Sequence, residues 1–276
     1  MSWHGRLSLH YSRDGERTTS HDRHHGPLRV LQRLYPEGPG ICHHVLVHPP
    51  GGMVGGDELE IEITLDAGSH ALVTAPGATR WYRSSGALAR QQARLSLAAG
   101  ARMEWLPLEN IAYRGCRAVN EVRLQLAPGA EAMGWDLVAL GLPTAGEPFD
   151  SGCFRQHLEV PGRWLERAII DATDRVLLDS PLGLAGHRVL ATMWWACGEP
   201  PPPARRQRLL DSAREVLATD PLRRTAGATA PQPAVLVLRV LADSVEPAMH
   251  CLRAVRVAWR REAWGMAAEP PRIWRT

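Results

Sequence analysis

The fold is decided by a glycine-rich stretch and the alternating run behind it, Pro49-Pro50-Gly51-Gly52-Met53-Val54-Gly55-Gly56-Asp57 followed by Glu58-Leu59-Glu60-Ile61-Glu62-Ile63-Thr64-Leu65. A phosphate-binding loop would need a Lys-Ser/Thr pair after its second glycine, and the stretch has none. A dinucleotide-binding fingerprint would need a helix next, but residues 58–65 alternate polar and apolar side chains as a half-buried strand does. We therefore interpret Gly51, Gly52, Gly55 and Gly56 as a backbone turn motif that leads into a sheet.

A second pattern, Leu-x-x-Gly followed by a small residue, recurs roughly every thirty residues, at 65–69, 97–101 and 126–130. Each copy separates two alternating runs, so we predict a hairpin turn in which glycine supplies the positive φ angle. The regular spacing favours stacked hairpins in a layered or solenoid-like β-architecture, and a plain sandwich would give similar spacing.

The pattern changes after Pro181, where helical spacing and Pro-rich breaks appear. The expected elements are helices over 204–218 and 246–264, a strand over 234–241 and a loop over 226–233. We expect residues 1–180 to form a β-body and residues 181–276 to add two helices and one strand packed on it, within a single domain spanning 1–276. We interpret the apolar run Met193-Trp194-Trp195 and the apolar face of the last helix as core packing. A protein-contact surface is the alternative for both.

Composition excludes several classes of function. The net charge is only +3 and the arginines are dispersed, whereas nucleic-acid binding favours clustered basic stripes. No run approaches the roughly 18 apolar residues of a membrane span, and residues 1–6 lack the apolar core of a signal peptide. We therefore expect a cytoplasmic protein. Five scattered cysteines without C-x-x-C spacing argue against a disulfide framework or a structural zinc site.

Histidines and carboxylates are the candidate metal ligands. His21, His24 and His25 lie in the polar segment 1–30, which we expect to be loop, so solvated histidines are favoured over a metal site.

The most distinctive blocks contain acidic residues that have two interpretations. The sequence has no nucleophile elbow and no zinc-protease motif that would give these acids a catalytic role. They satisfy backbone amides in tight turns, or they line a polar cavity that suits divalent cations. These acids are Asp57, Glu104, Glu109, Asp136 and Glu147.

Five blocks occur in a fixed order along nearly the whole chain. They are Gly-Gly-x-x-Gly-Gly-Asp (51–57), a Thr-to-Tyr-Arg-Ser block (74–84), Glu-Trp-Leu-Pro-x-Glu-x-Ile (104–111), Leu-Gly-x-x-x-x-Gly-Glu-x-Phe (140–149) and Pro-Arg-Ile-Trp-x-Thr (271–276). Together they resemble the UreD (UreH) family of urease accessory proteins. Leu108 and Leu142 stand where that family usually has Gln and Arg.

The resemblance implies a mainly β fold, a two-layered, helix-like stack of antiparallel strands and hairpins with a small α-helical cap in the C-terminal third. It implies a non-enzymatic scaffold that binds apo-urease and the accessory proteins UreF and UreG, and that delivers nickel through an internal polar tunnel. Nickel would be in transit, with no tightly bound cofactor. The residues expected to line the tunnel or support it are Asp57, Glu104, Glu109 and Glu147, with Tyr82, Arg83 and Ser84.

Two other functions stay open at this point. Ten tryptophans and only two phenylalanines suit a β-helical enzyme that cleaves polysaccharide with paired carboxylates and stacks sugar rings on tryptophan. The N-terminal histidines suit a free-standing metal-binding protein, and the test is whether nickel binding depends on residues 1–26.

Overall fold

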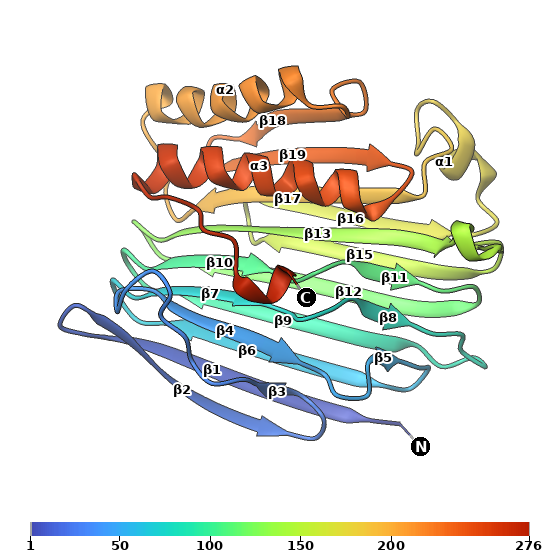
Figure 1. Ribbon diagram of the computed structural model, residues 1–276, viewed down its shortest axis with the longest axis horizontal. Coiled ribbons are helices and arrows are strands. Elements are labelled where there is room, and N and C mark those ends of the chain that lie inside the picture. Colours follow the sequence, from blue (N-terminus) through green and yellow to red (C-terminus); the bar gives the residue numbers. More distant parts are fainter. Residues whose placement is uncertain (1, 276) are drawn as a thin grey trace.

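The computed structural model describes residues 2–275 and shows two stacked β-sheets with helices on the outer face of the larger one (Figure 1). The chain coils from one sheet to the other, so that segments about thirty residues apart lie side by side. The predicted mainly β, two-layered stack with a helical cap in the C-terminal third is confirmed.

The smaller sheet has seven strands in the order β16-β15-β12-β9-β6-β1-β2. Its strands are β1 (His4–Asp14), β2 (Arg17–His25), β6 (Glu58–Leu65), β9 (Ala89–Leu97), β12 (Cys116–Leu126), β15 (Gly152–Val160) and β16 (Trp164–Asp171). Neighbouring strands from β1 to β15 run parallel, while β1–β2 and β15–β16 are antiparallel pairs at the two edges.

The larger sheet has 12 strands, with the main order β18-β19-β17-β13-β10-β7-β4-β3. The strands of this main order are β3 (Arg29–Val30), β4 (Cys42–Val47), β7 (His70–Thr74), β10 (Arg102–Leu106), β13 (Glu131–Leu142), β17 (Val189–Cys197), β18 (Ala226–Gln232) and β19 (Val235–Ala242). Four short strands pair outside this main order: β5 (Gly52–Met53), β8 (Thr79–Trp81), β11 (Asn110–Ala112) and β14 (Glu147–Pro148). The strands from β4 to β13 are parallel, and β17, β19 and β18 continue the sheet antiparallel.

The Leu-x-x-Gly turns join the two sheets, so the prediction of antiparallel hairpins at these turns is wrong. β6 ends at Leu65, the chain turns through Gly68, and β7 then pairs with β4 and β10 of the opposite sheet. Successive turns stack: Ala98 N–H donates to Leu65 O at 2.9 Å, and Ala127 N–H donates to Leu97 O at 2.9 Å. A period of two identifies a half-buried strand without identifying its neighbour, so hairpin and crossover look alike in sequence.

The N-terminal segment, expected to be loop, forms the antiparallel pair β1 and β2. Leu7, Leu9 and Tyr11 of β1 are fully or almost fully buried, and the residues between them are polar and face outward. Because half of the residues in this segment are polar and face outward, the sequence resembles a loop. The chain turns between β1 and β2 at Asp14-Gly15, where Gly15 has a φ of 55°.

The C-terminal third contains α2 (Pro203–Thr219) and α3 (Val245–Trp264), which confirm the two predicted helices. The predicted strand over 234–241 is β19, but the expected loop over 226–233 is the edge strand β18, paired with β19 and covered by α2. Met193, Trp194 and Trp195 of β17 are each 0% exposed, which confirms core packing for this run. Three short helical turns complete the chain: α1 (Arg175–Asp179) and the 3-10 turns η1 (Pro143–Ala145) and η2 (Arg272–Arg275).

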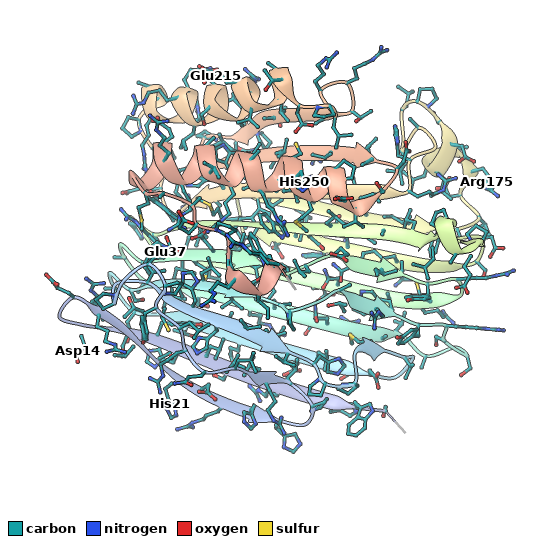
Figure 2. All side chains as sticks on the ribbon, in the orientation of Figure 1. Asp14, His21, Glu37, Arg175, Glu215 and His250 are labelled. Carbon is teal, nitrogen blue, oxygen red and sulfur yellow. The ribbon has the colours of Figure 1, made fainter. Side chains whose placement is uncertain are left out.

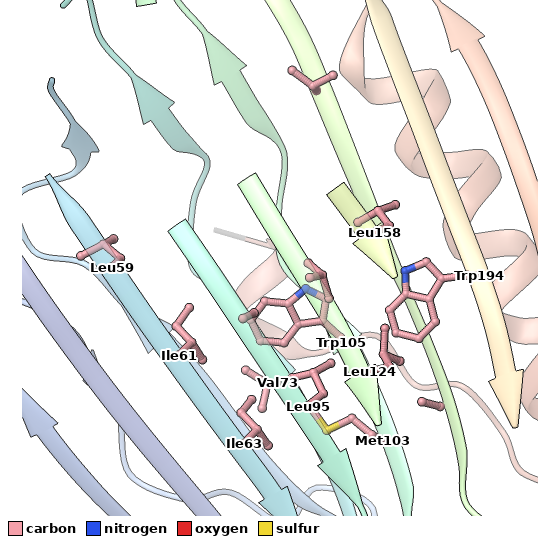
Figure 3. Packing of buried hydrophobic residues seen from close by; sticks show 14 of the residues in the cluster. Leu59, Ile61, Ile63, Val73, Leu95, Met103, Trp105, Leu124, Leu158 and Trp194 are labelled. Atoms are coloured by element: carbon pink, nitrogen blue, oxygen red, sulfur yellow. The ribbon is translucent and has the colours of Figure 1, made fainter. Parts of the chain in front are cut away.

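The core has two parts, one between the sheets and one between the larger sheet and the helices. Figure 3 shows the first part, in which side chains of both sheets interdigitate. Leucine and isoleucine of β6, β9, β12 and β15 face Val73, Met103, Trp105 and Trp194 of the larger sheet. All five cysteines are free thiols. No helix within residues 2–275 has both the length and the hydrophobicity of a membrane span.

Candidate functional site: a polar file between the sheets

The glycine-rich stretch packs directly on the segment that follows β8. A Cβ atom at Gly52 would overlap the Tyr82 ring, and a Cβ atom at Gly55 would overlap the Ser84 hydroxyl. The glycine block and the Tyr-Arg-Ser block, which are separate in sequence, therefore form one structural unit.

Asp57 closes this unit. Its carboxylate accepts hydrogen bonds from the backbone N–H of Val54 at 2.9 Å and of Trp3 at 2.8 Å, and the residue is 1% exposed. Gly51 and Gly56 have φ angles of 76° and 98°, which favour glycine. Asp57 thus joins the turn to the segment that enters β1.

The three residues of the Tyr-Arg-Ser block, Tyr82, Arg83 and Ser84, differ in exposure and contacts. The half-buried Tyr82 ring lies 5.0 Å from the Tyr113 ring, and Arg83 is exposed. The Ser84 hydroxyl accepts a hydrogen bond from Gly86 N–H at 3.1 Å.

Glu104 faces the helices rather than the space between the sheets. Its Oε2 lies 2.6 Å from Arg256 Nε and its Oε1 lies 3.5 Å from Arg260 Nε, both on α3. Arg260 also binds Glu37 at 2.7 Å, and Glu37 contacts His43 at 2.9 Å. We call Glu37, Glu104, Arg256 and Arg260 the ionic lock. Burial alone would raise the pKa of Glu37, but hydrogen bonds from His43 and Arg260 outweigh it and lower the pKa to about 2.

The other two predicted acids lie elsewhere. Glu109 is half-buried and close enough to Arg253 of α3 for their charges to interact, whereas Glu147 is exposed on β14. The structure therefore distributes the seven predicted residues over three places: the glycine turn, the face beneath α3 and the surface.

A different set of polar side chains occupies the space between the sheets. Gln91, Asn120 and Gln156 lie side by side, in register, on β9, β12 and β15. Gln91 Nε2 donates to Asn120 Oδ1 at 3.1 Å. Asn120 and Gln156 are 3% and 1% exposed and reach across to β13 of the opposite sheet.

Asp136 on β13 is the centre of this network. Its Oδ1 accepts a hydrogen bond from Asn110 at 2.7 Å, and its Oδ2 accepts from Asn120 at 2.9 Å and Gln156 at 3.0 Å. Burial raises the pKa of Asp136 even though these three bonds act in the other direction. The carboxyl group therefore holds its proton more firmly than an exposed aspartate does.

A second group of polar side chains lies beside this network, toward the edge of the smaller sheet. Thr192 lies in register with Asp136, and its hydroxyl donates to Glu166 Oε1 at 2.8 Å. The half-exposed Arg239 of β19 binds the same carboxylate at the surface beside β16. We call the following residues the polar file: Gln91, Asn110, Asn120, Asp136, Gln156, Glu166 and Thr192.

At its other end the polar file meets a cavity of about 180 Å³ beneath the glycine-rich stretch. Gln91 lines this cavity and also a narrower one behind it that reaches Trp105 and Pro107. The polar side chains that line the first cavity are His48, Thr79, Arg80 and Gln91. The polar file thus crosses an apolar core from a cavity to an outer edge.

Sequence reasoning singled out Asp136 only as one acid among five, and it missed the amides. A signal was present. Asn120 and Gln156 share the parity of the buried apolar residues of β12 and β15, for example Val122 and Leu158, so they interrupt the inward-facing half of the alternation.

The three N-terminal histidines lie on the edge strand β2 and are exposed (Figure 2 labels His21). His24 and His25 are consecutive on the strand and point to opposite faces. Within residues 2–275, no group of three or more His, Cys, Asp or Glu side chains is gathered to hold a metal ion.

Comparison with known proteins gives the family. A family model described as UreD urease accessory protein matches residues 4–275. A Leptothrix cholodnii protein named urease accessory protein UreD is 62% identical over 278 residues, covering 100% of both chains. Proteins of the same name from Paracidovorax citrulli and Verminephrobacter eiseniae are 58% and 59% identical over 274 residues, covering 99% of each chain. The relatives are named as accessory proteins and not as enzymes. The chain belongs to the UreD family of urease accessory proteins.

Proposed function

We propose that this chain is a urease maturation scaffold that guides nickel ions toward apo-urease along the polar file. The observation that carries the proposal is the line of oxygen-bearing side chains through an otherwise apolar core. Buried polar groups cost stability unless they are fully satisfied, and Gln156 Oε1 is buried without a hydrogen-bond partner. A core evolved for stability alone would use apolar residues at these positions.

The chemistry of the polar file suits passage rather than storage. Amide, hydroxyl and carboxyl oxygens are weak ligands for nickel compared with a closed cage of His or Cys. An ion in transit must bind well enough to enter and weakly enough to leave. A cation beside Asp136 would favour the ionised carboxylate, against the effect of burial on its pKa.

The proposal includes the partners that the family resemblance implies: UreF, UreG and the urease structural subunits. In this proposal residues 1–276 act as one unit in the cytoplasm, and nickel is cargo rather than a resident cofactor. Family membership supports a role in urease maturation, and the dispersed net charge of +3 gives no reason to include nucleic acid.

Two leucine substitutions on one strand test the route. Asn120→Leu puts an apolar side chain into the polar file, whereas Gln125→Leu puts the same side chain on the exposed outer face of β12. Urease subunits, UreF, UreG and nickel would be combined with each variant, and both urease activity and bound nickel would be measured.

We expect Asn120→Leu to lower activity and bound nickel together, with Gln125→Leu at the wild-type level. Thermal unfolding and co-purification with UreF show whether the inward variant is folded and still binds its partner. A folded Asn120→Leu variant that loads urease like the wild type would exclude the polar file as the route. Absence of any activation by the wild-type chain would exclude the maturation role itself.

A further inference from the structure

His48 lies in the wall of the cavity, in a turn that two prolines restrain. It follows β4 directly, and its carbonyl oxygen accepts a hydrogen bond from Gly51 N–H at 2.9 Å. Pro49 and Pro50 fix two further φ angles between these residues. The His48 ring lines the cavity, and its Nε2 atom is buried without a hydrogen-bond partner.

Most other buried or half-buried histidines have a partner. The His44 ring is bonded to Tyr11 at 2.6 Å, and His43 contacts Glu37 at 2.9 Å. His70 Nε2 also lacks a hydrogen-bond partner, but it lies 3.9 Å from Glu104 Oε1 beside the ionic lock, and the charges of arginines 102 and 260 disfavour a cation there. His48 is therefore a half-buried histidine that combines an unpartnered ring nitrogen with a position in the wall of a cavity.

The charges around His48 favour a cation. Asp57 is the ionisable group whose charge acts on the His48 ring. Arg80 also lines the cavity, but it is exposed, so water and salt screen its charge. Burial lowers the pKa of His48 against the effect of Asp57 and so favours the neutral ring, the form that can donate a lone pair to a metal ion.

We propose that His48 is a transient nickel ligand, the first nitrogen donor that an ion meets before it enters the polar file. Imidazole suits nickel better than amide oxygen does, and a single imidazole binds too weakly to trap the ion. Its Nε2 atom makes no hydrogen bond that an incoming ion would have to break. The assignment rests on the proposed role of the chain in nickel delivery and adds a specific waypoint to it.

The direct test observes the ring itself. The chain has 12 histidines, so selective labelling of histidine gives few resonances, and the His48 signal is the one missing from His48→Ala. Nickel chloride is then titrated into the wild-type protein, because paramagnetic Ni²⁺ broadens the signal of a ligand. We expect His48 to broaden at lower nickel than His250, an exposed histidine on α3 (Figure 2). A sharp His48 signal after His250 has broadened would overturn the proposal.

The second test uses the activation assay. His48→Ala and His48→Asn should each raise the nickel concentration for half-maximal activation about tenfold, which corresponds to about 1.4 kcal/mol of lost binding free energy. His250→Ala should leave it unchanged, and thermal unfolding should show that the His48→Asn variant is folded. Unchanged nickel dependence in both His48 variants would overturn the assignment while the delivery role stands. Failure of the wild-type chain to activate urease would instead remove the delivery role, and the titration would still decide whether His48 binds nickel.

Discussion

Replacing Glu104 by alanine should destabilise the protein by about 3 kcal/mol, because it leaves a buried cation without its counter-ion. Glu104 is 0% exposed, and its bond to Arg256 Nε is 2.6 Å long. Without Glu104, the guanidinium of Arg256, a residue that is 2% exposed, would retain its hydrogen bonds to the backbone carbonyls of residues 268 and 269, at 3.5 and 3.3 Å. Arg260 keeps both bonds to Glu37, which places the cost at the lower end of the about 3–5 kcal/mol measured for broken buried pairs.

Urea denaturation followed by tryptophan fluorescence measures this cost, since the chain has ten tryptophans. For a protein of this size, about 3 kcal/mol corresponds to a fall in Tm of about 6–12 °C. The double variant Glu104→Met/Arg256→Met removes both charges and should recover most of the loss. A loss below about 1 kcal/mol for Glu104→Ala, or a double variant no more stable than the single one, would refute the ionic lock as a buried, paired cluster.

Three further predictions follow from the turn, the lock and the surface. Gly55→Ala should cost about 1–3 kcal/mol in urea denaturation because its methyl group overlaps the facing serine, whereas Gly77→Ala, with open space around it, should be nearly neutral. The pKa of Glu37 is about 2 in the folded protein, below its ordinary value of 4.5. The stabilisation from its ionised carboxylate is therefore complete above about pH 4.5 and is lost as the pH falls toward 2. Glu37→Gln should flatten the dependence of the urea midpoint on pH in that window. Asp57→Ala and Glu147→Ala should lower nickel loading of urease while UreF still co-purifies, and unfolding or lost UreF binding would show a structural role instead.

The β-body was predictable because its signals are local. Alternation over 58–65 and the three Leu-x-x-Gly turns each lie within a short window, and they correctly indicate strands, turns and stacking. The partner of each strand is not a local property. Whether the chain after Leu65 folds back on its own sheet or crosses to the other depends on what covers the inner face, so the predicted hairpins became crossovers.

The candidate site was harder to predict for a related reason. Glu104 was singled out as one of five acids in the distinctive blocks, but its partner Arg256 lies 152 residues away, and no local pattern links the two. Asp136 depends on amides from three other strands, and a single neutral Asn or Gln within a strand carries no distinctive spacing. Only the parity of Asn120 and Gln156 hinted at their inward direction.

The ionic lock also bears on how the chain is made. Proteins emerge from the ribosome N-terminus first, and domains tend to fold as they emerge. Strand β10, which carries Glu104, and the loop that carries Glu37 are synthesised long before α3, which supplies both arginines. Until Val245–Trp264 leaves the ribosome, the carboxylates of Glu37 and Glu104 lack their arginine partners, and the apolar outer face of the larger sheet is exposed to water. A nascent or truncated chain that ends before α3 is therefore expected to be a client for chaperones, even though its stacked coils are already complete.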